Sequence, residues 1–391
     1  MNKKYRSFIS VSELFPINSV GIATARDSLV IDINTDKLIG RLKAFRNEKY
    51  SDEEISDLLG ISDTSTWSLH NARNTFINEK NWKDYITDIL YRPFDCRKII
   101  YHRSLIERGR EEVMRHMIGG KNIGICIGRQ WGSVGSPNYD VVFISNTIID
   151  LNLYRRGGEL IFPLYIYPDT ETEKNHSSEG GGTMMMVFEK DAEYTDRRPN
   201  INMEYYHLLE STYGERPTPE EILYYTYAVL YAPAYRQTYA EFLKSDFPRV
   251  PFTRDYALFS ESAELGEELT QLHLMKSDKL NKPIAKFHGE GSNVVHKSKK
   301  IGRNYQPDGG RVYINKEGQY FEGIPEEVWE YRVGGYQVLD KYLYDRRDRR
   351  LNNEEIQHYC RVATALYHTI ELQQAIDEIY PGVEEAVVEW K

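Results

Sequence analysis

Three short apolar stretches in the first half of the chain alternate with polar turns. They cover residues 122–128, 141–145 and 160–167, and each is rich in Ile, Val, Phe or Tyr. Gly, Asn, Asp or Pro bounds each stretch, which is the pattern of β-strands separated by turns. The pattern therefore predicts a sheet here, and we regard this sheet as the scaffold around which the rest of the chain is organised.

Shorter patterns precede this sheet. Residues 29–33 have the composition of a strand, whereas residues 37–45 carry apolar side chains at helical spacing. Ser51 followed three residues later by Glu54 forms a capping box, which predicts the start of a short helix. Two further helices are predicted, over residues 82–90 and 107–118.

The pattern after residue 200 is mainly helical. Thr218, Pro219 and Glu221 combine a capping hydroxyl, a first-turn proline and a capping-box glutamate, which together predict a helix start. Residues 353–379 carry the longest helical pattern. The sequence NKEG at residues 315–318 lies between two short apolar runs and predicts a hairpin.

These patterns predict an α+β fold in which a mixed β-sheet core is followed by a largely helical second half. Residues 1–168 form the mixed α/β part, with Arg and Gln on the loops of its sheet. Residues 169–200 are polar, contain three consecutive glycines, and form a linker or long loop. Residues 201–391 form the mainly helical part, which also holds a basic loop and the hairpin.

The turns of the organising sheet carry side chains that can read DNA bases. Arginine can donate two hydrogen bonds to guanine, and glutamine can pair with adenine in the same way. An alternative is that these side chains cap strand ends or pair with Asp95 and Asp140. The candidates for base contact are Arg129, Gln130, Arg155 and Arg156.

A second candidate surface is the basic segment at residues 286–311. Its only acids are Glu290 and Asp308, although the whole chain has a net charge of -9. A local excess of cations in an acidic protein favours contact with phosphate, whereas the alternative is a solvated loop. The candidates for phosphate contact are Lys297, Lys299, Lys300 and Arg303.

Catalytic motifs are absent from the sequence. It has neither the Asn/Asp-Pro-Pro-aromatic loop that holds a flipped adenine nor a P-loop for a nucleotide. The three cysteines are far apart, lack zinc spacing and suit a reducing cytoplasm. No apolar run is long enough for a membrane span. We therefore expect a cytoplasmic protein without contact to a membrane, a metal ion or a cofactor of its own.

Several segments, in their order along the chain, resemble the C-terminal specificity region of single-polypeptide restriction–modification enzymes of type ISP. In that group a nuclease, an ATPase, an adenine methyltransferase and a target-recognition domain follow one another. The main segments are residues 91–95 (YRPFD), 124–130 (GICIGRQ), 149–153 (IDLNL) and 160–165 (LIFPLY). Further segments are residues 14–22 (LFPINSVGI), 325–329 (PEEVW) and 334–336 (GGY).

The resemblance implies a module that recognises a site in double-stranded DNA and positions an adenine for a methyltransferase domain of the same parent chain. That domain would bind S-adenosylmethionine, and this chain would be a C-terminal part without catalytic activity. Two alternatives remain open. The chain could be a protein-interaction scaffold that docks on a separate methyltransferase, or an enzyme with an unrecognised site.

Overall fold

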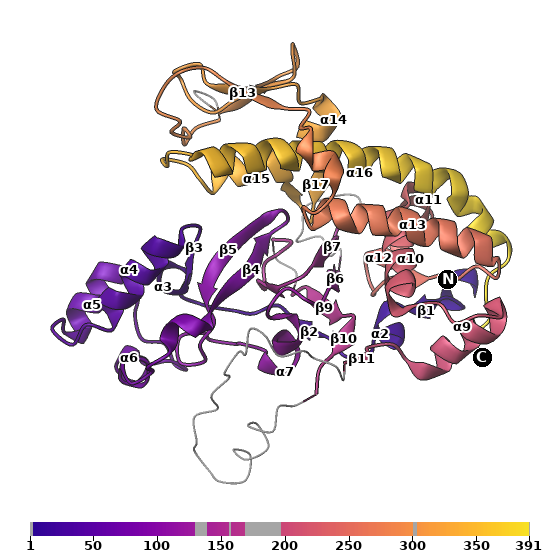
Figure 1. The fold of residues 1–391 in the computed structure, drawn as a ribbon, viewed down its shortest axis with the longest axis horizontal. Helices are drawn as coiled ribbons and strands as arrows, with labels where there is room; N and C mark the ends of the chain where they lie inside the picture. Colours follow the sequence, from indigo (N-terminus) through magenta and orange to yellow (C-terminus); the bar gives the residue numbers. More distant parts are fainter. Residues whose placement is uncertain (1–2, 130–138, 156–157, 169–196, 300–302, 391) are drawn as a thin grey trace, which may run out of the picture.

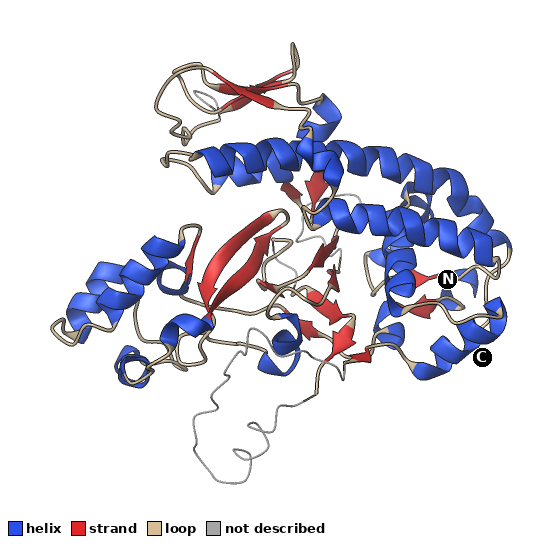
Figure 2. Ribbon diagram, in the orientation of Figure 1, coloured by secondary structure: helices blue, strands red, loops and turns tan. Residues whose placement is uncertain are grey.

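The computed structural model describes residues 3–129, 139–155, 158–168, 197–299 and 303–390. Figure 1 shows a first half built of sheets and short helices, with long helices of the second half packed along and above it. Figure 2 shows the same division in secondary structure. The predicted α+β class is confirmed.

The organising sheet has four strands in the order β2-β9-β6-β7. β6 (Gly124–Ile127) pairs antiparallel with β7 (Val142–Ser145) and with β9 (Leu160–Pro163), and β2 (Ser19–Val20) extends the β9 edge. Every residue of β6 and β7 is buried. Burial on both faces explains why these strands are continuous apolar runs rather than alternating ones. The predicted sheet is confirmed.

A second sheet lies beside the first, in the strand order β3-β5-β4-β8. β4 (Ile86–Arg92) and β5 (Asp95–Ile100) form a hairpin, β3 (Ile31–Asp32) pairs with β5, and β8 (Ile148–Ile149) runs parallel to β4. The predicted helix over residues 82–90 is therefore wrong. A 3-10 turn (Trp82–Tyr85) leads directly into β4. The apolar pattern of residues 82–90 is too short to stabilise a helix, so strand pairing along β5 decides the conformation of this segment.

Two further predictions need correction. Residues 29–33 are split between a helical turn, α3 (Asp27–Val30), and the short strand β3. The helix expected over residues 107–118 is reduced to α7 (Glu111–Met114) and a 3-10 turn (Arg115–Met117). Arg110 has a φ of 57°, which is incompatible with a helix that began before it.

Three helices of the first half lie on the side of the second sheet (Figure 1). α4 (Thr35–Phe45) and α5 (Asp52–Leu59) confirm their predictions, and α6 (Leu69–Ile77) follows them. Ser51 and Glu54 form the expected capping box at the start of α5. The short helices near the N-terminus are α1 (Lys3–Arg6) and α2 (Val11–Leu14).

The second half is built on three long helices. α10 (Pro219–Tyr231) packs against α13 (Tyr256–His273), which in turn packs against α16 (Asn353–Glu385). A Cβ atom at Gly266 would lie 1.9 Å from the carbonyl oxygen of Tyr224, so only glycine allows α10 and α13 to approach this closely. The remaining helices are α9 (Met203–Tyr213), α11 (Pro233–Thr238), α12 (Ala240–Leu243), the 3-10 turn η3 (Asp278–Asn281), α14 (Glu326–Trp329) and α15 (Val338–Tyr344).

A small antiparallel sheet stands above α15 and α16 in Figure 1. Its order is β13-β16-β15-β14. The predicted hairpin at residues 315–318 connects two of these strands and is confirmed. The bounds are β13 (Lys286–His288), β14 (Asn304–Gln306), β15 (Arg311–Tyr313) and β16 (Tyr320–Glu322).

Segments far apart in the sequence join the two halves. β1 (Ile9–Ser10) pairs with β12 (Arg249–Val250), and the ring of Tyr5 stacks on Phe242. The chain's beginning therefore packs with the helical half rather than with the sheets that follow it. Two more strand pairs complete the described fold: β10 (Tyr165–Ile166) with β11 (Arg198–Pro199), and β17 (Arg332–Val333) with β18 (Tyr336–Gln337).

Candidate nucleic-acid interface

Tyr154 ties together the two loops that carry the predicted base readers. Its hydroxyl donates a hydrogen bond to the carbonyl oxygen of Cys126 in β6, at 2.8 Å. A Cβ atom at Gly128 would lie 3.0 Å from the Tyr154 ring, so the loop after β6 lies directly against this side chain. Arg129 and Arg155 follow these two packed positions, and both are exposed. Gln130 and Arg156 lie outside the described residues.

One alternative for Arg129, an ion pair with Asp95, is not found among the described residues. Asp95 accepts hydrogen bonds from Arg97 and Arg346 instead. The guanidinium carbon of Arg129 lies 4.5 Å from the ring centroid of Phe247. Stacking on an aromatic ring orients an arginine and leaves its donors available.

A glycine hairpin from the second half completes this junction, and its residues 334–336 appeared in the sequence analysis only as a segment of the family resemblance, not as part of a site. The backbone N–H of Gly334, between β17 and β18, donates to the carbonyl oxygen of Asp140 at 2.9 Å. A Cβ atom at Gly334 would lie 2.3 Å from Tyr154. Three loops therefore meet at one tyrosine, and Arg332, two residues before Gly334, is exposed.

The basic loop between β13 and β14 contains both exposed and buried cations. Lys297 is exposed, and Lys299 is exposed while its Nζ lies 2.6 Å from Asp340. Arg303 is only 2% exposed and its Nε lies 3.1 Å from the same carboxylate. The interpretation of Arg303 as a phosphate contact therefore needs correction: it is an interior anchor that fixes the loop on α15. Lys300 lies outside the described residues.

Buried amides hold the described part of this loop in a defined shape. Gln319 is 1% exposed, and its Oε1 accepts hydrogen bonds from the backbone of Asn293 and from the side chain of Asn315, both at 2.8 Å. The backbone N–H of His296 donates to Ile314 at 2.7 Å. Satisfied buried amides fix a single backbone path. Lys297 and Lys299 are thus presented from a folded surface rather than from a solvated coil.

A network of buried charges joins the first half to the second. Asp95, in β5, lies 2.7 Å from Arg97 and 2.8 Å from Arg346, which precedes α16. Arg346 also reaches Glu355 in α16, at 3.1 Å. Burial by itself would raise the pKa of Asp95, but the charges of Arg346 and Arg97 outweigh it and hold this pKa below its usual range.

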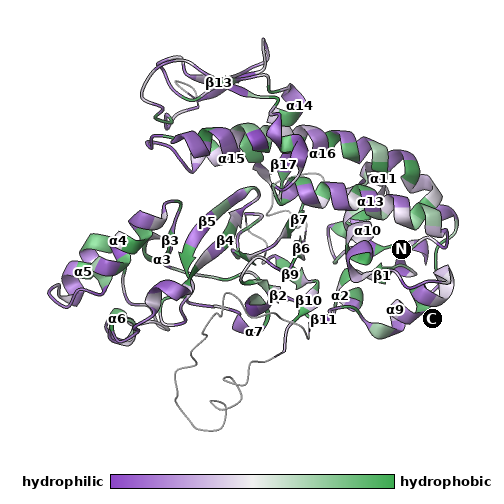
Figure 3. Ribbon diagram, in the orientation of Figure 1, coloured by the Kyte–Doolittle hydropathy of each residue, from purple (hydrophilic) through white to green (hydrophobic). Residues whose placement is uncertain are grey.

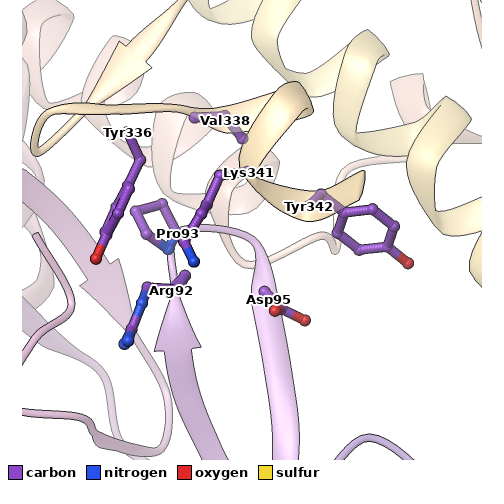
Figure 4. Close-up of a pocket in the computed structure, with 7 residues that line it drawn as sticks. All are labelled: Arg92, Pro93, Asp95, Tyr336, Val338, Lys341 and Tyr342. Atoms are coloured by element: carbon purple, nitrogen blue, oxygen red, sulfur yellow. The ribbon is translucent and has the colours of Figure 1, made fainter. Parts of the chain in front are cut away.

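A small pocket lies at the edge of this network (Figure 4). Arg92 and Pro93 come from the β4–β5 hairpin, whereas Tyr336 and Lys341 come from the second half. Arg92 is paired with Asp150 at 2.8 Å. The charged groups of the pocket thus take part in contacts within the protein. These contacts help to fix the first half relative to the second.

The described residues offer no sign of a metal centre. No group of three or more His, Cys, Asp or Glu side chains within them could hold a metal ion. No helix in the described part of the chain is long and apolar enough to cross a membrane.

Comparison with known families identifies the class of protein. Residues 13–375 match the family described as Type ISP C-terminal specificity domain. Because the match covers most of the chain, the protein belongs to this family, and the resemblance found in the sequence segments is confirmed. A comparison with curated proteins gave no significant match.

Solved structures contain the same fold as a part of longer chains. A DrdV–DNA complex has a TM-score of 0.68 at 20% identity, covering 95% of this chain and 38% of that one. LlaBIII, a Type ISP restriction–modification enzyme bound to DNA, has a TM-score of 0.69 at 19% identity, covering 96% and 24%. A nuclease-deletion mutant of LlaGI with a DNA substrate mimic has a TM-score of 0.63 at 18% identity, covering 96% and 29%. The chain thus spans less than two fifths of each protein it matches.

Proposed function

We propose that this chain is the double-stranded DNA recognition module of a restriction–modification enzyme. Its role would be to grip the duplex, read a short site and position an adenine for a methyltransferase domain of the same parent protein. That domain would bind S-adenosylmethionine, whereas this chain would hold no cofactor and catalyse no reaction. Membership of the specificity-domain family is the observation that carries the proposal, and we expect the parent protein to act in the cytoplasm.

The arrangement of the interface supports separate groups of residues for base contacts and for phosphate contacts. Arg129 and Arg155 are exposed beside a rigid sheet, which suits base contacts that must be held in register. Lys297 and Lys299 are exposed on the loop between β13 and β14, which suits contacts to phosphate. Gln130, Arg156 and Lys300 keep their proposed roles in DNA binding on the sequence alone.

A protein-interaction scaffold is the other candidate, and the surface gives it little support. Such a scaffold would expose a contiguous apolar patch. The exposed large apolar or aromatic side chains of the described residues are scattered over separate elements: Tyr50, Leu58, Met203 and Tyr344.

Selection of a random duplex library on the purified chain tests the proposal. A recognition module enriches one short motif, and its affinity falls steeply as salt rises because counterions are released from the DNA. The comparison of the enriched motif with a scrambled duplex gives the ratio of specific to nonspecific binding. A chain that binds no duplex at low salt would refute the proposal.

A further inference from the structure

The turn between α15 and α16 carries four arginines within residues 345–350, and we name it the arginine turn. Two of them form ion pairs within the protein. Arg346 is 3% exposed and bonds to Asp95 and Glu355, while Arg349 reaches Glu355 at 2.8 Å. Arg347 and Arg350 are exposed. The turn is thus anchored by two of its arginines, which leaves the other two at the surface.

The outer arginines differ from their neighbours in having no carboxylate partner among the residues that the structure describes. The guanidinium carbon of Arg347 lies 4.1 Å from the ring centroid of Tyr344, which is 42% exposed. Lys341 lies 5.4 Å from the same ring. An aromatic ring holds the guanidinium in place without neutralising its charge. Figure 3 shows this turn as hydrophilic.

Backbone hydrogen bonds join the arginine turn to the basic loop. The N–H of Val295 donates to Arg349 at 2.9 Å, and the N–H of Asp348 donates to Val295 at 2.8 Å. Lys297 and Lys299 follow immediately after this contact. Two segments about 50 residues apart in the sequence thus form one surface with four exposed cations, at the end of α15 away from α9 (Figure 1).

We infer that this surface, made of Lys297, Lys299, Arg347 and Arg350, binds the sugar–phosphate backbone of duplex DNA regardless of its sequence. The inference rests on the proposed function and assigns the binding of the DNA backbone to the second half of the chain. Arginine binds phosphate through a planar fork of donors, and Tyr344 offers a flat ring against a sugar. The chain is acidic as a whole, so cations gathered on one folded surface fit a polyanion.

Titration of the full chain with a scrambled duplex at several salt concentrations tests the inference. Removal of one phosphate contact lowers the slope of log affinity against log salt by roughly 0.9. The double variant R347A/R350A is therefore expected to bind several-fold more weakly, with a slope smaller by about 2. The same weakening is expected on the selected motif.

The matched control is R216A/R254A. It also removes two exposed arginines, but Arg216 follows α9 and Arg254 precedes α13, far along the chain from the arginine turn. Its affinity and salt slope are expected to equal those of the unaltered chain. A thermal melt of both variants shows whether either has become unfolded.

A gain of affinity provides a test that misfolding cannot imitate. Asp348 is an exposed acid within the turn, with a φ of 58°. Asparagine tolerates this left-handed conformation as well as aspartate does, so Asp348→Asn removes one negative charge without straining the backbone. We expect Asp348→Asn to bind every duplex several-fold more tightly.

The outcomes separate this inference from the proposed function. If R347A/R350A and Asp348→Asn both bind like the unaltered chain, while a motif is still selected, the surface does not hold DNA and remains free for an acidic protein partner. If R347A/R350A weakens only the selected motif, these arginines read sequence and the inference is wrong. If the unaltered chain binds no duplex, the proposed function itself fails.

Discussion

Arg129 is exposed, and its two interpretations, as a base reader and as a structural residue, predict opposite effects of a substitution. Its guanidinium stacks on Phe247, and a lysine at this position would keep both the charge and the cation–π contact. A lysine would not provide the bidentate geometry that recognises guanine. We therefore expect Arg129→Lys to relax the preference at one position of the selected motif by about 1–3 kcal/mol. Library selection measures this change.

Arg198→Lys is a suitable control for Arg129→Lys, because Arg198 is exposed in β11 and lies outside the junction at Tyr154. It should leave the motif unchanged. If Arg129→Lys lowers the melting temperature and the motif stays intact, Arg129 acts only through Phe247.

Glu159 is a buried carboxyl group whose charge destabilises the fold. Its side chain is 0% exposed, its Oε1 accepts a hydrogen bond from the backbone N–H of Tyr154, and its Oε2 has no partner among the described residues. Burial raises the pKa of Glu159 from 4.5 to about 7. The folded state therefore holds its proton between these values while the unfolded state releases it, and stability falls as pH rises through this window, by about 3 kcal/mol.

Glu159→Gln removes this destabilisation while keeping the oxygen that Tyr154 bonds. We expect the variant to be more stable than the unaltered chain at pH 8 by up to about 3 kcal/mol, with no gain at pH 4. Urea unfolding across pH 4–8 measures it. Glu48→Gln, at an exposed position, serves as the control. Parallel stability curves for Glu159→Gln and the unaltered chain would refute the assignment.

At the scale of elements, the β4–β5 hairpin depends on one buried ion network. Asp95 neutralises Arg97 and Arg346, and removing it deprives both buried cations of this carboxylate. Breaking a buried pair in this way typically costs about 3–5 kcal/mol. Arg97 keeps its pair with Asp345 and Arg346 keeps its pair with Glu355, so Asp95→Ala should lower the free energy of unfolding by at most this amount, as measured by chemical denaturation.

Asp88→Ala in the same hairpin is the matched control. Asp88 pairs with Lys98, but its side chain is 52% exposed, and exposed pairs contribute less than about 1 kcal/mol. If both alanine variants cost the same, the buried network does not join the halves in the way described.

The β17–β18 hairpin should lose stability when a side chain is added at Gly334. Its φ is 59°, and a Cβ atom would overlap the Tyr154 ring. Gly318 has a φ of 86° but open space around it, so Gly318→Ala reports backbone strain alone, about 1 kcal/mol. Gly334→Ala is expected to lower the melting temperature by clearly more than Gly318→Ala. Equal shifts would mean that the Tyr154 contact contributes nothing.

For the whole molecule, a net charge of -9 makes DNA binding depend on where the cations lie. Lys297→Ala with Lys299→Ala removes two exposed cations from the loop between β13 and β14, and Arg303 remains to pair with Asp340. We expect equal weakening on all duplexes, with a salt slope smaller by about 2. The control, Lys80→Ala with Lys83→Ala at two exposed positions, should leave binding unchanged. Weakening confined to the selected motif would identify Lys297 and Lys299 as base readers.

The sequence by itself determined the class of fold and the elements with local causes. Capping boxes at Ser51 and Thr218 began helices where expected, and continuous apolar runs became the buried strands of the organising sheet. These features depend on residues within a few positions of one another, so a linear pattern contains them. The order of the family segments likewise identified the specificity domain.

Tertiary structure decided what depends on partners far along the chain. Residues 86–92 became a strand because β5 and β8 pair with them, and Arg303 became an interior anchor because α15 brings Asp340 beside it. The surface shared by the basic loop and the arginine turn exists only because the backbone at Val295 meets Arg349. Pairing and burial between distant segments leave no local pattern, so only the folded chain shows which cations are anchors and which face the solvent.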